Sequence, residues 1–454
     1  MSDAGNDREA VLESVRERVT PDAAERAAMR AVVDEVTERA EDAVADLPVE
    51  ARICHVGSTA RDTWLAGDRD VDVFVCFPPD LDRESLEEYG LGVGEAVLPE
   101  GRQEFAEHPY VVGEVEGFEV DLVPCYDVAA ATDNRSAVDR TPFHAAYLED
   151  RIDDAIAGEV RLCKQFLTGV GCYGSDLKTR GFSGFLAELL VLEYGDFPAL
   201  LRAAADWHPP VRLDPADHGT TTFEDPLVVV DPTDPDRNVA AVLSATNLAR
   251  FQHYARDLLT DPRVALFEAT DPGPLDIEGI REHVERRGTT PVAVRFEAPD
   301  VVDDQLWPQL RTSLDGVADE LQRRGFDVLR RVAMAEETGV LLVELAVAER
   351  PAVERHEGPP VHVRDHAERF VAAYAGDSDV YGPFVDGDRY VVERERAFTT
   401  AVAFLESDAL FDVGLGVDVK AALEAGYDVL AGSDLAACAD EFGVPLARYF
   451  DPTP

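Results

Sequence analysis

The sequence predicts an α+β protein built from several domains. Three observations support this fold class. Short apolar runs broken by Gly and Pro lie between residues 51 and 127, a helical period follows at residues 147–261, and a strand–helix–strand–strand series follows a Pro/Gly-rich joint at residues 271–274. A chain of 454 residues, 46% of them hydrophobic, has enough apolar side chains for several cores, which excludes global disorder. We therefore expect three domains, at residues 1–146, 147–270 and 271–454.

The first domain is expected to be mixed α/β, behind two N-terminal helices. The amphipathic pattern over residues 8–47 divides at Thr20 and Pro21, where Thr20 is suited to cap the second helix. The strands that follow are expected at residues 53–56, 71–77, 110–115 and 118–124.

The two later domains differ in their periodicity. The middle one is expected to be mainly helical, around an insertion rich in Pro and Asp at residues 209–237. The final third is expected to begin as half of a ferredoxin-like unit, a shape common among domains that contact RNA. The predicted helices are 152–167, 183–193, 238–259 and 304–324, and the predicted strands of the final third are 292–297, 326–334 and 340–348.

The net charge of the chain indicates the solvent in which the protein works. Acidic residues outnumber basic ones 91 to 42, which gives a formal net charge of -49. A uniform acidic excess predicts a halophilic protein from a salt-rich cytoplasm, where screening by salt tolerates the self-repulsion. The net charge alone argues against a nucleic-acid partner, because phosphate binding normally depends on a basic surface. A partner of that kind would have to bind where the sequence departs locally from this background.

The N-terminus and the cysteines indicate location and redox state, but no activity. The N-terminus lacks an apolar segment, and no run approaches the roughly 20 apolar residues of a membrane span, so we expect a cytoplasmic protein with no membrane partner. The six cysteines lie far apart without a CxxC pair, so we expect core thiols and neither a disulfide framework nor a zinc site.

A phosphate-binding turn is predicted at residues 55–64. An apolar strand ends at Gly57, and a helix is expected to begin near Ser58, which is suited to cap it. Free N–H groups and the positive end of a helix dipole attract phosphate, and Arg61 follows one turn later. A Gly-Ser pair before a helix is, by itself, most often only a capping signal.

Three aspartates interrupt apolar strands after this turn. Asp70 and Asp72 alternate along one strand, so their carboxylates share a face, and Asp121 lies in a second strand. Oxygen donors this close together suit Mg²⁺, which completes its shell with water and substrate phosphates. The plain alternative is a solvated strand edge in an acidic chain. Asp68 shares the face of the pair, but its closeness to Gly67 favours a turn.

Three carboxylates, two metal ions and a triphosphate define in-line nucleotidyl transfer. One metal ion lowers the pKa of an attacking hydroxyl, and the other stabilises the departing pyrophosphate. Asp121 would hold the attacking side, as a metal ligand and proton acceptor, while Asp70 and Asp72 would bridge the metal ions.

These motifs resemble those of a known family, the archaeal (class I) CCA-adding enzymes, which are tRNA nucleotidyltransferases of the polymerase β superfamily. The resemblance runs over nearly the whole chain, and its motifs are specific in combination. They are Gly57-Ser58-x-x-Arg61-x-Thr63-Trp64-Leu65, Asp70-x-Asp72-Val73-Phe74, Asp121-Leu122-Val123-Pro124, Arg140-Thr141-Pro142-Phe143-His144 and Arg180-Gly181-Phe182-Ser183-Gly184.

The resemblance implies an architecture and a set of site residues. It implies a polymerase β-like nucleotidyltransferase palm domain, a helical central domain and a ferredoxin-like C-terminal RNA-binding domain. Asp70 stands where the family usually has Glu, a change that keeps the oxygen chemistry. The implied ligands of Mg²⁺ are Asp70, Asp72 and Asp121, and the implied contacts to ATP or CTP are Ser58, Arg61, His144, Lys164, Tyr173 and Arg237.

Several of these residues also have plain structural interpretations. Lys164 can be a lysine that extends along a helix face, His144 a hydrogen-bonded structural histidine, and Tyr173 a core aromatic. In the final third the resemblance implies binding of the tRNA acceptor stem and T-arm, and a homodimer. We expect a local basic patch there, formed by Arg323, Arg324, Arg330, Arg331, Arg364, Arg389, Arg394 and Arg396.

The predicted activity is template-independent addition and repair of the 3′-terminal CCA of tRNA, from CTP and ATP, with release of pyrophosphate. Two alternatives remain open. A related poly(A) or oligoadenylate polymerase would use the same carboxylates and phosphate turn. A non-catalytic RNA-binding protein with a degenerate transferase domain would bind tRNA without metal-dependent turnover.

Overall fold

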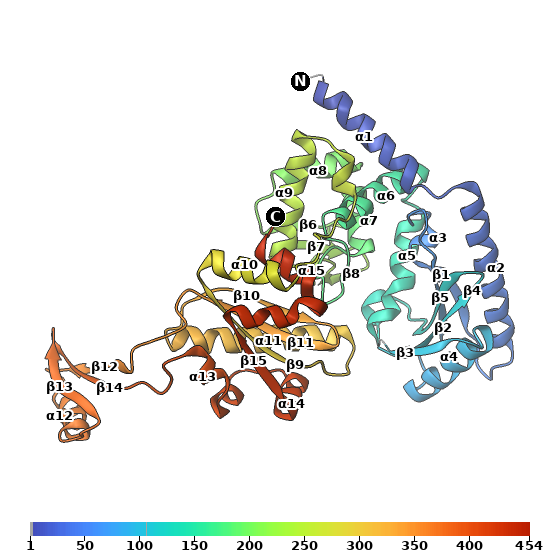
Figure 1. Cartoon of the computed structure of the whole chain (residues 1–454). Coiled ribbons are helices and arrows are strands. Elements are labelled where there is room, and N and C mark those ends of the chain that lie inside the picture. The colour runs from blue at the N-terminus through green and yellow to red at the C-terminus, as the bar shows by residue number, and fades with distance from the viewer. Residues whose placement is uncertain (1–2, 106) are drawn as a thin grey trace. The chain divides into compact units, whose positions relative to one another are not determined.

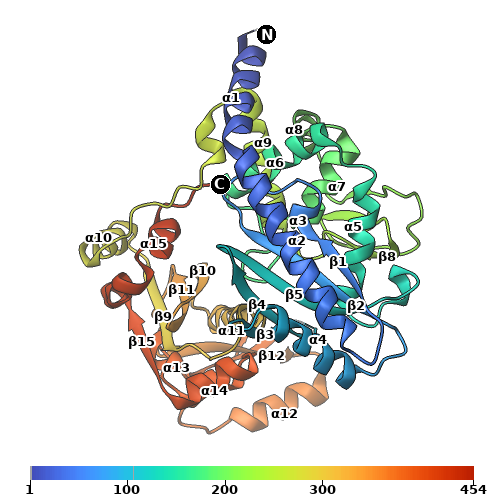
Figure 2. The ribbon, with the colours of Figure 1, turned by 90° about the vertical axis from the view of Figure 1, so that its right-hand side faces the viewer.

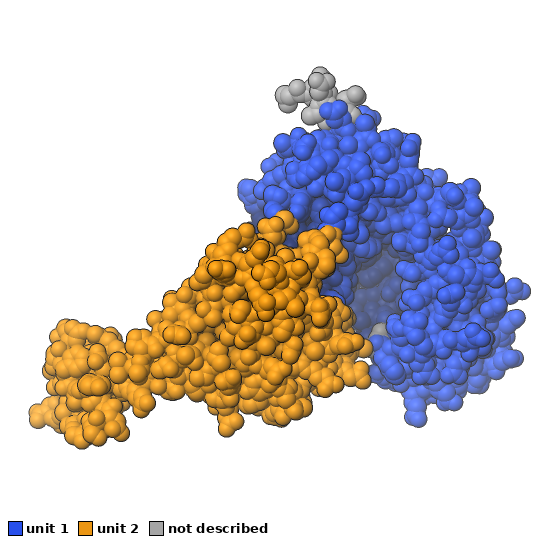
Figure 3. All heavy atoms as spheres, in the orientation of Figure 1, with its two compact units in different colours: residues 1–270, 454 blue, residues 271–453 orange. Residues whose placement is uncertain are grey.

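The computed structural model describes residues 3–105 and 107–454. The chain divides into two compact units, which Figure 3 shows in separate colours. One holds residues 1–270 with residue 454, and the other holds residues 271–453. Within the described ranges, no helix is long and apolar enough to cross a membrane.

Two helices open the first unit, α1 (Asp3–Val19) and α2 (Ala23–Ala45). The expectation that Thr20 caps the second helix is wrong. Asp22 is the N-cap instead, because its carboxylate accepts the N–H groups of Ala24 and Glu25, and Glu25 completes a capping box. The Thr20 hydroxyl donates back to the carbonyl of Arg16 at 2.7 Å, so it closes the first helix.

A five-stranded mixed sheet follows, in the order β1-β2-β5-β4-β3 (Figure 1). The central pair β2 and β5 is parallel, and the other neighbours are antiparallel. One face packs against α2 and α4, as Figure 2 shows, through alternate residues such as Val73 and Leu122. The other face is therefore left for the aspartates. The elements are β1 (Arg52–Val56), α3 (Gly57–Ala60), β2 (Asp70–Phe77), α4 (Arg83–Val97), β3 (Arg102–Phe105), β4 (Pro109–Val115) and β5 (Phe118–Tyr126).

The rest of the first unit is helical with one small sheet. The sheet, in the order β6-β7-β8, occupies the expected insertion. The helix expected from residue 238 begins only at Ala245, capped by Ser244, because Asn238 ends β8 and its side-chain oxygen accepts the N–H of Val229 at 2.9 Å. The elements are α5 (Thr141–Glu149), α6 (Asp154–Gly169), α7 (Gly184–Tyr194), α8 (Phe197–Ala205), β6 (Val211–Leu213), β7 (Leu227–Asp231), β8 (Asp234–Asn238) and α9 (Ala245–Thr260).

The second unit contains the expected strand–helix–strand–strand series as β9, α11, β10 and β11. Its main sheet has the order β10-β11-β9-β15, with one apolar cluster on each face. A smaller sheet, β12-β14-β13, packs with α12. The elements are α10 (Ile277–Arg287), β9 (Thr290–Glu297), α11 (Asp303–Arg323), β10 (Val328–Ala335), β11 (Thr338–Leu345), β12 (Val353–Pro360), α12 (Arg364–Tyr374), β13 (Val380–Asp386), β14 (Arg389–Glu395), α13 (Ala401–Leu405), α14 (Val417–Ala425), β15 (Tyr427–Ala431) and α15 (Ala439–Phe450).

The arginines expected to form a basic patch in this unit are ion-paired. Arg323 and Arg324 both bind Glu320, and Arg331 lies 2.9 Å from Asp315. Acidic residues close to them in sequence or in the sheet thus neutralise much of the expected positive charge. The remaining pairs are Arg330–Glu344, Arg364–Glu368, Arg389–Glu357, Arg394–Glu354 and Arg396–Glu354.

Candidate active site

The predicted phosphate turn lies between β1 and β2. Its helix, α3, is a single turn whose N-cap position is Val56 with no side-chain cap, so the expectation that Ser58 caps a helix is wrong. The turn begins directly at Gly57, which has φ +74°. A Cβ at Gly57 would lie 2.0 Å from Oδ2 of Asp72. Glycine is therefore required twice, for the left-handed backbone and for the close approach of the turn to this carboxylate.

The three predicted carboxylates share one face of β2 and β5. In the parallel register Asp72 lies opposite Asp121, and Asp70 lies opposite Glu119. Burial and the charge of Asp72 raise the pKa of Asp121 to about 7. Burial and the charge of Asp70 raise the pKa of Asp72, while Arg61 acts in the opposite direction. Mutual repulsion of this kind favours a cation between the carboxylates.

The donor set fits Mg²⁺ as a pair of carboxylates. Among the described residues, no group of three or more His, Cys, Asp and Glu side chains is arranged so that it could hold a metal ion. The sheet register instead brings together two carboxylates, those of Asp72 and Asp121, with Asp70 two residues along the strand. Mg²⁺ typically takes one or two carboxylates and fills its remaining positions with water and substrate phosphates.

Arg61 and Lys164 meet at a buried glutamate, Glu188 of α7, which is 1% exposed. Nη2 of Arg61 donates to Oε2 of Glu188 at 2.9 Å, and Nζ of Lys164 lies 3.4 Å from Oε1. Burial alone would raise the pKa of Glu188, but the charges of Lys164 and Arg61 hold it below its usual value. Glu188 is therefore an ionised carboxylate shared by two cations.

Lys164 and Arg61 differ in how many of their N–H groups donate to protein acceptors. Nζ of Lys164 also donates to the carbonyl and the hydroxyl of Thr63, at 3.1 and 3.2 Å, so its three N–H groups have three protein partners. Arg61 has a side chain only 10% exposed, and its buried Nε has no hydrogen-bond partner among the described residues. Of these two predicted phosphate contacts, Lys164 is the more fully engaged by protein groups, and Arg61 is held through Nη2.

Tyr173 lies beside the start of α7. It forms a backbone bridge with Phe182. A Cβ on Gly184 would lie 3.2 Å from the Tyr173 hydroxyl and 3.7 Å from Nζ of Lys164, so Gly184 leaves room for both groups. Burial raises the pKa of Tyr173, and the charge of Glu188 adds to this effect. The phenol consequently stays protonated and can donate a hydrogen bond.

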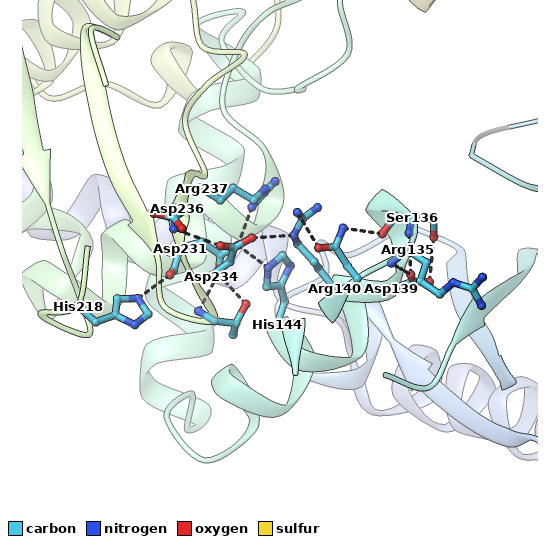
Figure 4. Close-up of polar contacts among 12 residues, drawn as sticks. Arg135, Ser136, Asp139, Arg140, His144, His218, Asp231, Asp234, Asp236 and Arg237 are labelled. Atoms are coloured by element: carbon cyan, nitrogen blue, oxygen red, sulfur yellow. Dashed lines mark hydrogen bonds and ion pairs between the residues drawn. The ribbon is translucent and has the colours of Figure 1, made fainter. Parts of the chain in front are cut away.

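His144 and Arg237 meet at Asp231, the last residue of β7 (Figure 4). Nε2 of His144 and Nη1 of Arg237 each lie 2.8 Å from Oδ2 of Asp231, while the N–H and hydroxyl of Thr233 donate to Oδ1. Burial opposes ionisation, but these hydrogen bonds and the charge of His144 hold the pKa of Asp231 well below its ordinary value. The His144 ring stacks on Phe185 of α7 with 4.0 Å between centroids.

The predicted residues gather in three groups. Two acids that hold predicted residues together, Glu188 and Asp231, are not among the predicted site residues. Glu188 and Asp231 each hold two predicted contacts to the nucleotide. A signal for both was present, because Glu188 is the one charged residue in the apolar run 185–192, and Asp231 ends the apolar run 227–230. The groups are Asp70, Asp72 and Asp121 beside the Ser58 turn; Arg61, Lys164 and Tyr173 around Glu188; and His144 with Arg237 on Asp231.

A mixed sheet with paired carboxylates beside a glycine turn defines a nucleotidyltransferase, and family comparison agrees. Residues 37–144 match a nucleotidyltransferase domain. Residues 158–268 match the second domain of tRNA nucleotidyltransferases, and residues 287–432 match the C-terminal domain of CCA-adding enzymes. The predicted polymerase β-like, multidomain α+β fold class is confirmed.

The chain belongs to the family of CCA-adding enzymes. It is 65% identical to the CCA-adding enzyme of Haloarcula marismortui, over 98% of this chain and 99% of the relative. It is 60% identical to the one from Halorubrum lacusprofundi, over 99% and 100% of the two chains, and 39% identical to the one from Methanosarcina mazei, over 96% and 97%. The predicted family and enzyme class are confirmed, and the first two relatives support the prediction of halophilic character.

Proposed function

We propose that the protein adds and repairs the 3′-terminal CCA of tRNA, using CTP and ATP without a nucleic-acid template. The observation that carries this proposal is the register of Asp72 opposite Asp121, next to the Gly57 turn, in a chain that belongs to this family. The tRNA 3′-hydroxyl attacks the α-phosphorus, a new O–P bond forms, and the bond to the β-phosphate breaks, which releases pyrophosphate.

The carboxylates supply the metal-binding and proton-accepting groups in this proposal. Asp70, Asp72 and Asp121 would hold Mg²⁺. When bound, the metal supplies Lewis-acid stabilisation of the phosphate oxygens. Asp121 takes the proton of the attacking hydroxyl, because its carboxylate lies opposite Asp72 on the face that would hold the metal.

The other predicted residues bind the nucleotide from two sides. Ser58 and Arg61 face the triphosphate from the turn, and the ion pair between Arg61 and the buried Glu188 supports a fixed position for the guanidinium. Lys164 and Tyr173 belong to the same side. Since the three N–H groups of Lys164 are engaged by Thr63 and Glu188, its contact with phosphate requires Nζ to exchange one of these partners.

His144 and Arg237 form the other side and act on the base end of the nucleotide. Both side chains are held by the buried Asp231 carboxylate, which supports a fixed geometry there. Arg237 keeps a half-exposed side chain beyond this contact, so it can reach a ligand.

The remaining assignments extend this proposal. Three domains, at residues 1–146, 147–270 and 271–454, are supported by the family matches, each of which falls within one of them. The last domain would bind the acceptor stem and T-arm of tRNA by their backbone shape. A cytoplasmic location and a homodimer stay predictions of the resemblance.

The test of the metal assignment is Asp121→Asn, with the exposed Asp133→Asn as the matched control. Asp121→Asn should abolish incorporation of labelled CTP and ATP into tRNA that lacks CCA, while its circular dichroism spectrum is unchanged. Asp133→Asn should incorporate both nucleotides like the wild type. Near-normal incorporation by Asp121→Asn would sink the assignment.

The test of the product offers each nucleotide separately to tRNAs that lack one, two or three terminal residues. Ordered addition of C, C and then A, followed by a stop, is the expected result. Continued addition of A would indicate the poly(A) or oligoadenylate polymerase. Binding of tRNA with no metal-dependent turnover would indicate the non-catalytic RNA-binding protein.

A further inference from the structure

The Glu188 carboxylate reaches the phosphate turn by two routes. One is its ion pair with Arg61, and the other is the hydrogen bond that it accepts from the Thr63 hydroxyl. The backbone N–H groups of Arg61 and Thr63 both donate to the carbonyl of Ser58, at 3.3 and 3.0 Å. A residue of α7 therefore anchors both the side chain and the backbone of the turn.

Glu188 is the carboxylate that Arg61 and Lys164 share. Both cations pair with it in a buried cluster. The N–H groups of Lys164 are divided between Thr63 and Glu188, whereas the buried Nε of Arg61 has no hydrogen-bond partner among the described residues. The contact of Nη2 with Glu188 is therefore the interaction that fixes the guanidinium of Arg61.

Glu188 holds the guanidinium of Arg61 at one edge. Nη2 donates to Oε2 of Glu188 at 2.9 Å, and the side chain of Arg61 is only 10% exposed. Loss of this contact would leave the guanidinium without the bond that sets its direction.

We infer that Glu188 is a positioning residue for nucleotidyl transfer, which fixes the guanidinium of Arg61 and, through Thr63, the backbone of the phosphate turn against the triphosphate. The inference rests on the proposed function, because it takes a nucleoside triphosphate as the ligand. CTP and ATP share the triphosphate, so Glu188 affects both nucleotides to the same extent. It leaves the choice between them to the His144–Asp231–Arg237 group.

The experiment compares Glu188→Gln with Glu193→Gln, an exposed glutamate on the same helix. Calorimetric titration with inorganic triphosphate and Mg²⁺ should show affinity lowered about 10- to 100-fold in Glu188→Gln, the loss expected when a charge-assisted hydrogen bond is misdirected. KM for CTP and KM for ATP should rise by the same factor. Glu193→Gln should match the wild type in each measurement.

A purely structural role would give a different pattern. Glu188→Gln would then unfold at a lower temperature, while the folded protein would bind inorganic triphosphate within about twofold of the wild type, and the inference would be overturned. A change in KM for one nucleotide alone would also overturn it, since the triphosphate is common to both.

If Glu188→Gln does not fold, Thr63→Val provides the test. It removes the hydroxyl that ties Glu188 to the turn, with no change in charge, and Thr63→Ser keeps that hydroxyl. We expect inorganic triphosphate to bind about three- to tenfold more weakly to Thr63→Val, and normally to Thr63→Ser. Equal binding by the two variants would overturn the inference.

A failure of the proposed function can be told apart from a failure of the inference about Glu188. If the wild type does not extend tRNA with CTP and ATP, CCA addition is wrong. The calorimetric difference between Glu188→Gln and Glu193→Gln does not depend on that activity, so it still decides the role of Glu188.

Discussion

Two buried glutamates, one in each unit of the chain, bind arginine in different ways. Glu344 of β11 is fully buried and accepts Nε and Nη2 of Arg287, at 2.6 and 2.9 Å. The hydroxyls of Thr289 and Tyr449 donate to the same carboxylate. Burial opposes ionisation, but these hydrogen bonds hold the pKa of Glu344 below its usual value. The two parallel bonds to Arg287 make a closed structural pair, and Arg330 lies farther away, with Nε 3.6 Å from Oε2 of the same carboxylate.

Glu188 takes only one N–H group from its arginine and shares its remaining capacity with Lys164 and Thr63. Nε of Arg61 has no hydrogen-bond partner among the described residues. Burial of the carboxylate is therefore alike in the two pairs, and they differ in how many N–H groups of the arginine it accepts. We call the two-bond pair of Arg287 closed and the one-bond pair of Arg61, next to the phosphate turn, open.

The largest effect on nucleotide incorporation should come from Arg61→Met, which removes the guanidinium of the open pair. We expect kcat/KM for both nucleotides to fall about 100-fold, because a buried charge-assisted contact to the phosphates is lost. The exposed Arg202→Met is the control and should leave steady-state kinetics unchanged. Equal kinetics for the two variants would remove the distinction between the open and the closed pair.

A pH change between 6 and 8 should change the charge of the aspartate group through Asp121, beside Asp70 and Asp72, whose pKa values are also raised. Glu188 and Glu344 have lowered pKa values and stay ionised in this window. The pKa of Asp121 is raised to about 7, so without metal it is protonated below pH 7. Mg²⁺ needs the ionised form, so its affinity should fall up to about tenfold per pH unit below 7. Calorimetric Mg²⁺ titrations check this, and a constant affinity from pH 6 to 8 would contradict it.

The raised pKa of Asp121 also predicts how the free energy of unfolding changes with pH. Because the folded protein holds the Asp121 proton more tightly than the unfolded chain, the free energy of unfolding without metal should decrease as pH rises from about 4 to about 7. Thermal unfolding should show that Mg²⁺ reverses this loss mainly above pH 7. Asp121→Asn should lack both effects.

Salt should have a smaller effect on incorporation, through the exposed acids and not through the buried pairs. With a net charge of -49, the wild type should be several-fold more active in molar KCl than in dilute buffer, where screening is weak. Glu344→Gln should show the same salt dependence as the wild type, because buried pairs are screened little. Maximal tRNA extension in dilute buffer, with no gain from KCl, would count against this view.

The smallest effect on incorporation should come from Arg287→Met, which breaks the closed pair. The free energy of unfolding should decrease by about 1–3 kcal/mol, because the buried Glu344 loses both parallel bonds. Activity per folded molecule should stay within about twofold of the wild type. Denaturant unfolding and steady-state kinetics measure the two quantities. A large loss of kcat would mean that Glu344, like Glu188, supports the reaction and not only the fold.

The sequence predicts the fold well, and period-2 alternation places Asp70 and Asp72 on one face of a strand without any tertiary information. The position of Asp121 opposite Asp72 comes from the parallel register of β2 and β5, which the alternation does not determine. Local competition also escapes prediction, since Asp22 and not Thr20 caps α2. The small sheet β6-β7-β8 has strands of only three to five residues, too short for a clear pattern. Partners 24 to 127 residues apart, such as those of Glu188, leave only the faint signal of a charge in an apolar run.

Helix α7 carries Phe185 and Glu188 three residues apart, which places them about one turn from each other. Phe185 supports His144, and Glu188 supports Arg61. A helix is stiff over one turn, so neither support can be displaced without the other. The two ends of the nucleotide-binding region are thus mechanically coupled through a single rigid element, and any sliding or rotation of α7 would misalign both together.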